Sequence, residues 1–461
     1  MARGDLAKNT ALLSLSAIAV KGINFVMIPL FSRWLSVEDY GTFDVISTYV
    51  ALLIPFLTLS TSDAVFRFAI GENQETKKKY LTTAFVLDLS LTVVASAIIV
   101  GISIALPWNL APLFVLYLFA EIGNKYMQGA LRAIRKLNLY ALGNIATTVG
   151  IVLGVTFLVY VLELGLPGMI AGYALGYLIG DLVLVVSSKI WTCLSFGKAS
   201  LNCCKEMLAY STPLIPNSIC WWVINASNRT VIGIFMGPIA NGVYAIASKV
   251  PNACTSVFQM FGISWQEAAV DSLNDADRKQ YYSGVLNKTI VSISSVIILL
   301  LACNFLMFEY LFDVGYSEAR YLLPILALSV EFVVISQFYG GIQIGLMQPK
   351  KNGLSTAVGA LFSLVATVVF VPIMGLYGAC ISTLLSNVAI TALRAMMLKD
   401  AIIYKLDFSV IVSLTAIAYF FICCYLPCSL LFVIINLLLA LFLFIFLNRD
   451  LISRIAKKVA L

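Results

Sequence analysis

The sequence contains no histidine, and only 11% of its 461 residues are charged. Soluble domains carry roughly 25% charged residues, so an ordinary soluble domain is excluded. The absence of histidine removes the side chain that most often carries protons near neutral pH. The sequence also shows no nucleotide-binding Walker motif, metal-ligand spacing or nucleophile–base pattern. We therefore expect no enzyme activity, no cofactor and no metal.

Cysteine is present but forms no recognisable site. The ten cysteines are scattered, none has CxxC spacing, and most lie in or beside apolar segments, where cysteine behaves as a small hydrophobe. A disulfide framework and a zinc site are therefore excluded. The net charge of +7 is concentrated in the loops between apolar runs, so we expect no nucleic-acid partner.

Apolar runs recur along the whole chain, and 61% of the residues are hydrophobic. Each run is near the roughly 20 residues that a helix needs to cross a hydrocarbon core. The sequence predicts an all-α integral membrane protein with about fourteen transmembrane helices. We expect them at residues 9–32, 42–69, 81–105, 110–131, 138–161, 168–189, 208–235, 240–264, 284–306, 320–347, 353–371, 376–397, 408–425 and 429–447.

Basic residues distinguish the two sides of the membrane. One set of loops and tails contains nearly all of them, for example Lys77-Lys78-Lys79 and Lys350-Lys351, whereas the alternate loops contain only Arg33 and Arg320. Because short cytoplasmic loops are enriched in Lys and Arg, we expect both termini in the cytoplasm.

An internal repeat relates the two halves of the chain. Ile18, Ile23, Asn24, Gly41, Phe43 and Ser47 match Ile219, Ile224, Asn225, Gly242, Tyr244 and Ser248 at one constant offset. Because six predicted helices separate the copies, we expect parallel repeats about an axis along the membrane normal. The predicted domains are two six-helix bundles, 1–200 and 201–400. Residues 401–461 add helices 13 and 14, which we expect to be peripheral, and a basic cytoplasmic tail.

Five basic residues lie inside predicted spans: Lys21, Arg67, Lys125, Arg229 and Lys249. Each costs at least a few kcal/mol at bilayer depth and normally faces a bundle interior or an aqueous cavity. Lys21, Arg229 and Lys249 have no acidic neighbour at helical spacing, which favours an anionic ligand between the helices. Arg229 is also near a predicted helix end, where it could reach the interface instead.

The other two basic residues have an acid one helical turn before them, in Asp63–Arg67 and Glu121–Lys125. That order is favourable on a helix, so Arg67 and Lys125 are predicted to form structural ion pairs, with an ion pathway as the alternative. Asp88, Asp181 and Glu331 have no local cation. The candidates for ion coupling, to protons or to sodium, are Asp63, Asp88, Glu121, Asp181 and Glu331.

A polar stripe marks the seventh predicted helix. Asn217, Trp221, Asn225 and Asn228 recur at helical spacing, with Arg229 alongside. In a membrane helix such a stripe faces protein or water rather than lipid. It could bind sugar hydroxyls and sugar rings, or it could serve as glue between helices at about 0.6 kcal/mol per contact. We predict the substrate-binding residues to be Lys21, Asn24, Asn217, Trp221, Asn225, Arg229 and Lys249.

Several of these segments are similar to one known family. Ile23-Asn24, followed by residues 29–41 (PLFSRWLSVEDYG), resembles the first helix and loop of the bacterial polysaccharide flippases of the Wzx, or O-antigen transporter, type. Residues 213–217 (PLIPN), Trp221-Trp222 and Ser248-Lys249 resemble the seventh and eighth helices of that family. Residues 265–267 (WQE) and 372–379 (PIMGLYGA) fit as well, so the resemblance spans essentially the whole chain.

The resemblance implies the fold of the multidrug/oligosaccharidyl-lipid/polysaccharide exporter superfamily, with two bundles around a central V-shaped cavity. It implies a flippase of the bacterial inner membrane that moves undecaprenyl-pyrophosphate-linked oligosaccharide units for O-antigen, lipopolysaccharide or capsule synthesis. Transport by alternating access, as an antiporter driven by an ion gradient, is expected. The expected partners are the lipid-linked oligosaccharide, membrane lipid, a polysaccharide polymerase and a chain-length regulator.

Two other functions are weighed against this one. A multidrug or toxin extruder of the same fold would export organic cations, and it should therefore prefer carboxylates over the excess of buried bases found here. A membrane glycan polymerase or ligase predicts a large outer loop, whereas the longest one here lies around residues 307–319.

Overall fold

The computed structural model describes residues 3–70, 72–275, 277–405, 407–427, 429–449 and 453. At residues 3–15, 196, 217, 225, 260, 263 and 274 it describes the backbone alone. Within these residues the secondary structure is helical and contains no strand, which confirms the all-α class. The chain divides into two compact units, Met1–Trp222 and Val223–Leu461. The predicted domain boundaries at residues 200 and 400 stay predictions.

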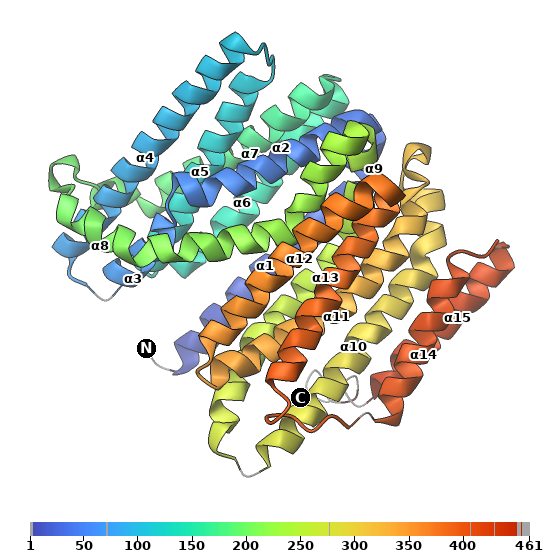
Figure 1. The fold of residues 1–461 in the computed structure, drawn as a ribbon. Coiled ribbons are helices and arrows are strands. Elements are labelled where there is room, and N and C mark those ends of the chain that lie inside the picture. The colour runs from blue at the N-terminus through green and yellow to red at the C-terminus, as the bar shows by residue number, and fades with distance from the viewer. Residues whose placement is uncertain are drawn as a thin grey trace. The chain divides into compact units, whose positions relative to one another are not determined.

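The first unit contains eight complete helices and the start of a ninth (Figure 1). They are α1 (Arg3–Trp34), α2 (Val37–Leu57), α3 (Thr61–Ala69), α4 (Gln74–Ala105), α5 (Ala111–Ala133), α6 (Leu137–Val155), α7 (Gly165–Ser188), α8 (Leu201–Ser211) and the first residues of α9 (Ile215–Asp271).

The second unit continues from α9. Its remaining helices are α10 (Arg278–Leu306), α11 (Ala319–Gly345), α12 (Pro349–Met374), α13 (Leu376–Met397), α14 (Phe408–Cys423) and α15 (Leu430–Leu447). Single π-helical turns, Thr156–Val161 and Met307–Leu311, extend α6 and α10.

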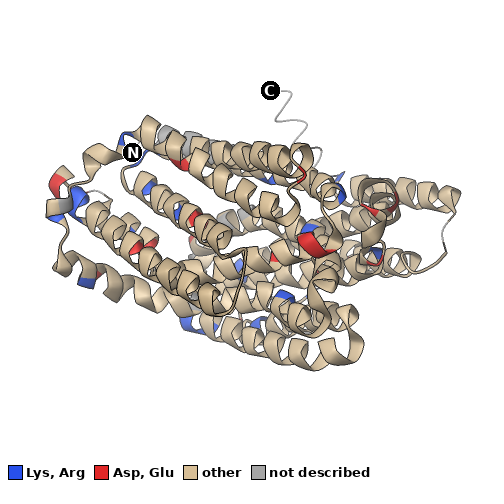
Figure 2. Ribbon diagram, turned by 90° about the horizontal axis from the view of Figure 1, so that it is seen from above, with Lys and Arg blue, Asp and Glu red and all other residues tan. Residues whose placement is uncertain are grey.

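Ten helical segments of the described chain are long and apolar enough to cross a membrane. Lys, Arg, Asp and Glu are sparse along these helices, as the mostly tan ribbon of Figure 2 shows. Each of the fourteen predicted helices has a counterpart in the structure, which confirms the predicted fold class.

One predicted helix is broken. The apolar run at 42–69 predicts a single helix, but α2 ends at Leu57 and α3 begins at Thr61. Leu59 and Ser60 between them both have positive φ angles, 48° and 55°, a conformation that non-glycine residues rarely adopt. The prediction of one continuous helix was therefore wrong, and Asp63 and Arg67 lie on a short helix of their own.

Helix α9 contains a break between the two helices that the sequence predicts in this region. Gly237 has φ 84° and ψ −179°, so two helices, 215–236 and 238–271, meet at this residue. Glycine adopts this backbone conformation without steric cost, and Pro238 is tolerated because it opens the second helix. The predicted helices 208–235 and 240–264 correspond to these two segments.

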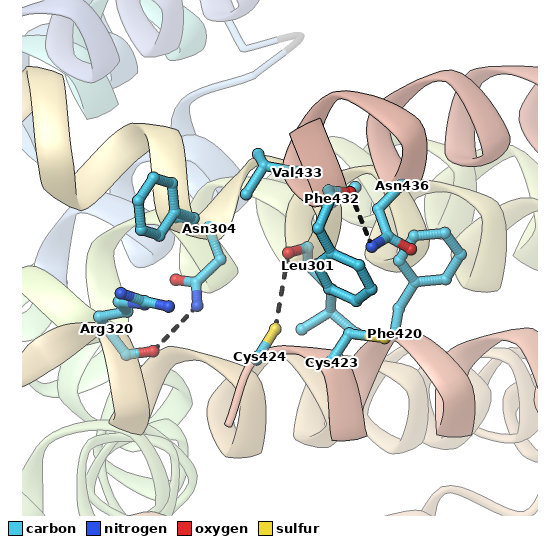
Figure 3. A pocket seen from close by; sticks show the side chains of 11 residues that line it. Leu301, Asn304, Arg320, Phe420, Cys423, Cys424, Phe432, Val433 and Asn436 are labelled. Atoms are coloured by element: carbon cyan, nitrogen blue, oxygen red, sulfur yellow. Dashed lines mark hydrogen bonds between the residues drawn. The ribbon is translucent and has the colours of Figure 1, made fainter. Parts of the chain in front are cut away.

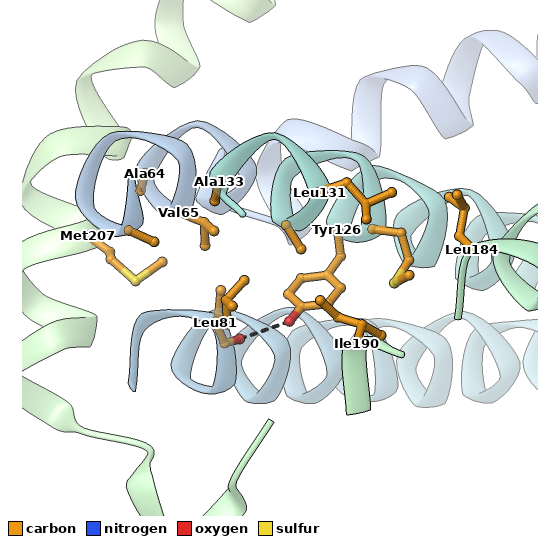
Figure 4. Packing of buried hydrophobic residues seen from close by; sticks show 13 residues of the cluster. Ala64, Val65, Leu81, Tyr126, Leu131, Ala133, Leu184, Ile190 and Met207 are labelled. Carbon is orange, nitrogen blue, oxygen red and sulfur yellow. Dashed lines mark hydrogen bonds between the residues drawn. The ribbon is translucent and has the colours of Figure 1, made fainter. Parts of the chain in front are cut away.

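The core of the first unit joins α3, α4, α5, α7 and α8 (Figure 4). Val65, Leu81, Leu131 and Met207 are buried in it. Tyr126 is buried in the same cluster and satisfies its hydroxyl group by donating to the backbone carbonyl of Leu81 at 3.0 Å. The short helix α8 is thereby fixed to the first unit.

Helices α6 and α7 pack closely because α7 presents glycine at every fourth position. Gly172, Gly176 and Gly180 are all buried. A Cβ atom added at Gly172 would lie 2.8 Å from the backbone nitrogen and Cα of Val155 on α6. Small residues spaced by four let membrane helices approach backbone to backbone, so this seam depends on the absence of side chains.

Aromatic stacking holds α9 against α11 in the second unit. The Trp265 ring lies 4.3 Å from the Phe338 ring, stacked at 12°, and its Nε1 donates to the Phe338 carbonyl at 2.9 Å. A Cβ atom at Gly341 would lie 2.8 Å from Cδ1 of Trp265. Since α11 is continuous through Gly340 and Gly341, this glycine pair serves packing and does not bend the helix.

The C-terminal helices α14 and α15 pack on α10. Figure 3 shows a small pocket of about 30 Å³ at this junction. Cys424 at the end of α14 donates to the Leu301 carbonyl of α10 at 3.5 Å. Asn436 is buried in the middle of α15 and donates to its own helix at Phe432. The pair therefore has a polar contact with the bundle although its helices carry no charge.

We expect Gly172→Val to destabilise the protein by about 1–3 kcal/mol, the usual cost of overpacking. The added side chain would meet the Val155 backbone, which cannot move aside. The measurement is the thermal transition of the purified protein in detergent. Gly101→Val is the matched control, because a Cβ atom at Gly101 on α4 meets nothing within 4 Å. An equal loss in both variants would contradict close packing at Gly172.

Candidate functional site

The predicted substrate cations are divided between the two units. Lys21 and Asn24 are exposed on α1 in the first unit. Arg229 and Lys249 are half-buried on α9 in the second unit, one on each side of the Gly237 break. Arg229 Nη2 donates to Ser248 Oγ at 3.5 Å, so the break brings the guanidinium next to the helix that carries Lys249.

Arg229 lines a polar cavity of about 60 Å³ in the second unit. Helices α9, α11 and α13 enclose it, and its polar lining consists of Asn228, Arg229, Tyr244, Ser248, Asn252, Thr255, Ser329, Thr383 and Asn387. None of the described residues that line it is acidic. One cation among hydroxyl and amide groups suits an anion or a hydroxylated ligand. The cavity has room for only a few water molecules, so it is too small for a sugar ring.

Both the Nδ2 and the Oδ1 atom of Asn228 form hydrogen bonds to other side chains. Its Nδ2 donates to Tyr244 Oη at 2.9 Å and to Thr383 Oγ1 at 2.6 Å, and its Oδ1 accepts from Thr367 Oγ1 at 2.5 Å. These bonds join α9 to α12 and α13. Of the two interpretations of the polar stripe, glue between helices is the one that applies to Asn228.

The other members of the stripe are described less fully. The side chains of Asn217 and Asn225 lie outside the described part of the chain. Trp221 has 40% of its surface exposed, while Trp222 donates from Nε1 to the Thr48 carbonyl of α2 at 2.9 Å. The sugar-binding role of Asn217, Trp221 and Asn225 stays a prediction.

Three of the predicted coupling carboxylates are held by neutral donors. Asp88 is 3% exposed and accepts from Thr61 Oγ1 at 2.7 and 2.9 Å. Glu331 is 2% exposed and accepts from Ser294 Oγ at 3.2 Å. Asp181 accepts from Asn124 Nδ2 at 2.8 Å. None of the three carboxylates makes an ion pair within the described part of the chain.

Asp181 belongs to a network of side-chain amides. Asn124 of α5 also donates to Thr147 Oγ1 of α6 at 3.2 Å. The Oδ1 atom of Asn124 accepts from Gln128 Nε2 at 2.7 Å, and Gln128 in turn reaches Asn144 Oδ1 at 3.1 Å. The carboxylate of α7 thus accepts from one amide of α5, and that amide belongs to a hydrogen-bonded chain that reaches α6.

The predicted ion pairs are not closed in this structure. Asp63 and Arg67 are both exposed on α3, and Lys125 is exposed on α5. No ion pair joins Asp63 to Arg67, or Glu121 to Lys125, among the described residues. Glu121 interacts electrostatically with Lys125 and by hydrogen bonds with the side chains of Tyr117 and Tyr177. The structural pairing of Arg67 and Lys125 therefore stays a prediction.

Two buried ionisable residues escaped the sequence analysis, Asp44 on α2 and Arg394 on α13. Both are 3% exposed. Arg394 donates from Nε to Ser355 Oγ at 3.0 Å, from Nη1 to the Ser336 carbonyl at 2.7 Å and from Nη2 to Thr356 Oγ1 at 2.9 Å. It therefore joins α11, α12 and α13. Each residue is near the end of a predicted helix, where a charge normally reaches water and gives no signal.

Comparisons with known proteins agree with this fold. A family model described as "Polysaccharide biosynthesis protein" matches residues 6–266. The chain is also 24% identical over 428 residues to the probable low-salt glycan biosynthesis flippase Agl15 of Haloferax volcanii, which covers 88% of this chain and 86% of the relative.

Solved structures of two transporter types share the fold. The lipid II flippase MurJ in an inward closed conformation has a TM-score of 0.71 at 14% identity, with 96% of this chain and all of MurJ covered. An inward-facing multidrug resistance MATE transporter has a TM-score of 0.64 at 14% identity, with 85% and 95% covered. The chain belongs to the polysaccharide biosynthesis protein family and has the fold of the MOP superfamily of transporters, as the sequence resemblance predicted.

Proposed function

We propose that the protein is a flippase for lipid-linked oligosaccharides, with an undecaprenyl-pyrophosphate-linked repeat unit as its substrate. The observation that carries the proposal is the position of Arg229, a half-buried cation in a cavity whose described lining consists of hydroxyl, amide and apolar groups and includes no acid. A pyrophosphate is the part of such a substrate that needs cations inside a membrane protein. Family membership and the resemblance to a glycan flippase support the same substrate class.

In this proposal, Lys21, Arg229 and Lys249 neutralise the pyrophosphate, and Asn24, Asn217, Trp221 and Asn225 contact the sugars. The units change conformation by alternating access while the lipid tail stays in the bilayer. The 60 Å³ cavity around Arg229 is too small for a saccharide, so the pyrophosphate end approaches Arg229 and the sugars bind outside this cavity.

Coupling to an ion gradient would use the buried carboxylates of Asp88 and Glu331 and the half-buried carboxylate of Asp181. Asp88, Asp181 and Glu331 accept hydrogen bonds from hydroxyl or amide donors, so each can gain a proton or a sodium ion without first breaking an ion pair. A buried carboxylate without a cation is costly, which favours ion uptake. Asp63 and Glu121 remain candidates on the sequence alone.

The multidrug alternative gains no support from the cavity. An exporter of organic cations needs acidic groups where its substrate binds, whereas the charged side chain among the described residues of this cavity is the guanidinium of Arg229. In an oligosaccharide flippase the working partners would be a polysaccharide polymerase and a chain-length regulator. The expected place is the bacterial inner membrane, with both termini in the cytoplasm.

We expect Arg229→Gln to lower glycan translocation about tenfold or more, because one charge-assisted hydrogen bond contributes roughly 1.5–3 kcal/mol. The measurement is surface glycan in a deletion strain that expresses the variant, together with the amount of lipid-linked oligosaccharide left on the cytoplasmic leaflet. The amount of inserted protein is determined in parallel.

Lys279→Gln is the matched control, since it removes an exposed cation from α10 of the same unit. Its glycan export should equal that of the wild type. Normal export by Arg229→Gln, at equal protein level, would refute the role of this cation. A deletion strain that gains drug sensitivity but keeps its surface glycan would favour the multidrug alternative.

We expect Glu331→Gln to abolish gradient-driven transport in proteoliposomes while downhill exchange of the same substrate persists. The amide keeps the shape and the contact with Ser294 but cannot exchange a proton or hold sodium as a carboxylate does. Transport is measured with an imposed proton gradient and, separately, an imposed sodium gradient.

Glu309→Gln, an exposed acid at the end of α10, is the control and should respond to both gradients as the wild type does. If Glu331→Gln accumulates substrate at the wild-type rate under the driving gradient, Glu331 takes no part in coupling. Asp181→Asn and Asp88→Asn extend the test to the first unit.

A further inference from the structure

A second and larger cavity lies away from Arg229, between α10, α14 and α15. It measures about 450 Å³. The three helices run side by side in Figure 1, and α14 and α15 both contact α10. Its lining comes from residues 287–292 in the middle of α10, from the first turns of α14 and from the last turn of α15. The basic loops predict that this end of α14 and α15 lies on the cytoplasmic side.

The polar end of the cavity carries two cations and one acid, namely Lys288, Arg449 and Asp407. Lys288 is exposed and makes no ion pair with any described residue. Arg449 lies 5.9 Å from the centre of the Phe446 ring, a cation–π contact. The described residues that line the cavity therefore carry a net charge of +1.

The first turn of α14 adds a second feature that favours an anion. Phe408 and Ser409 line the cavity, and Asp407 before them occupies the N-cap position without a side-chain capping bond. The first backbone N–H groups of a helix have no partner within that helix and attract anions together with the helix dipole. The two cations, Lys288 and Arg449, and the N-terminus of α14 thus line the same cavity.

The rest of the lining is apolar. Val291 of α10, Val412 of α14 and Phe446 of α15 form the wall that leads away from the charged end. Half of the Phe446 surface is exposed, as is half of Ile411 on the neighbouring turn of α14. A ligand held here meets charge at one end and hydrocarbon surface at the other.

We propose that this cavity binds an anionic phospholipid whose headgroup carries hydroxyl groups, of the phosphatidylglycerol type. Lys288, Arg449 and the N-terminus of α14 bind the phosphate, and Asp407 accepts a hydrogen bond from a headgroup hydroxyl. The acyl chains follow Val291, Val412 and Phe446 into the bilayer. Basic pockets between membrane helices on the cytoplasmic side are suited to anionic headgroups.

The site is distinct from the proposed substrate path. The described residues that line it include none of those assigned to the pyrophosphate or to the sugars. Its volume suits a headgroup with its glycerol, since pockets of about 300–1,000 Å³ hold ligands of that size. Because α10, α14 and α15 all contribute, the bound lipid would stabilise the attachment of the C-terminal pair to the bundle.

The experiment measures lipid binding to the purified, delipidated protein by native mass spectrometry and by thermal stability. Phosphatidylglycerol, phosphatidylethanolamine and undecaprenyl phosphate are added separately at equal concentration. We expect phosphatidylglycerol to be retained at least fivefold more than either of the others and to raise the thermal transition. Transport is not measured, so failure of this proposal is distinguishable from failure of the proposed function.

Two variants test the site itself. Lys288→Gln/Arg449→Gln should lose the retained phosphatidylglycerol at least fivefold. Ser409→Glu, which adds a negative charge to the lining, should do the same. Lys350→Gln/Lys351→Gln is the matched control, because it removes two cations from the start of α12, and it should bind lipid as the wild type does.

Equal retention of phosphatidylethanolamine would overturn the assignment of the headgroup. Tighter binding of undecaprenyl phosphate would assign the cavity to the carrier lipid and overturn the phospholipid proposal. Unchanged phosphatidylglycerol binding by a folded Lys288→Gln/Arg449→Gln variant and by Ser409→Glu would place the lipid elsewhere.

Discussion

An ionisable group that leaves water for the interior of a membrane protein must be paired, neutralised or surrounded by dipoles. In both units of this protein, dipoles perform this task. Asp88 meets a threonine hydroxyl, Glu331 a serine hydroxyl and Asp181 an asparagine amide. Arg394 is likewise held by hydroxyls and a carbonyl. The three acids therefore make no ion pair within the described part of the chain, whereas Arg394 of α13 donates to α11 and α12 and so joins the three helices.

Much of the fold could be predicted from the sequence, because the cost of burying a polar backbone in lipid leaves few solutions other than long apolar helices. The break in α9 was also predicted, as the gap between the helices expected at residues 208–235 and 240–264. The break between α2 and α3 was not. Leu59 and Ser60 have positive φ angles for which these residue types have no intrinsic preference. The surrounding structure must therefore impose these angles, and the local sequence does not predict them.

The candidate site was less predictable, for a related reason. Spacing along one helix identified the buried carboxylates, but their partners come from other helices: Thr61 for Asp88 and Asn124 for Asp181. Local spacing also left two roles open for the polar stripe, and only the tertiary structure shows that Asn228 bonds to Tyr244, Thr367 and Thr383. Arg394 was missed because a basic residue at a helix end looks like a loop residue until tertiary packing encloses it.

The glycine seam between α6 and α7 has a consequence for how the chain enters the membrane. Two helices that fit backbone to backbone can associate as a hairpin once both have been inserted, without waiting for later segments. Helix α7 brings the acid Asp181 into the bilayer, and the amide group that donates to it, on Asn124, belongs to α5 and also donates to Thr147 of α6. Those helices precede α7 along the chain. During synthesis, the charge-bearing helix therefore arrives last, at a polar site that its predecessors have already built.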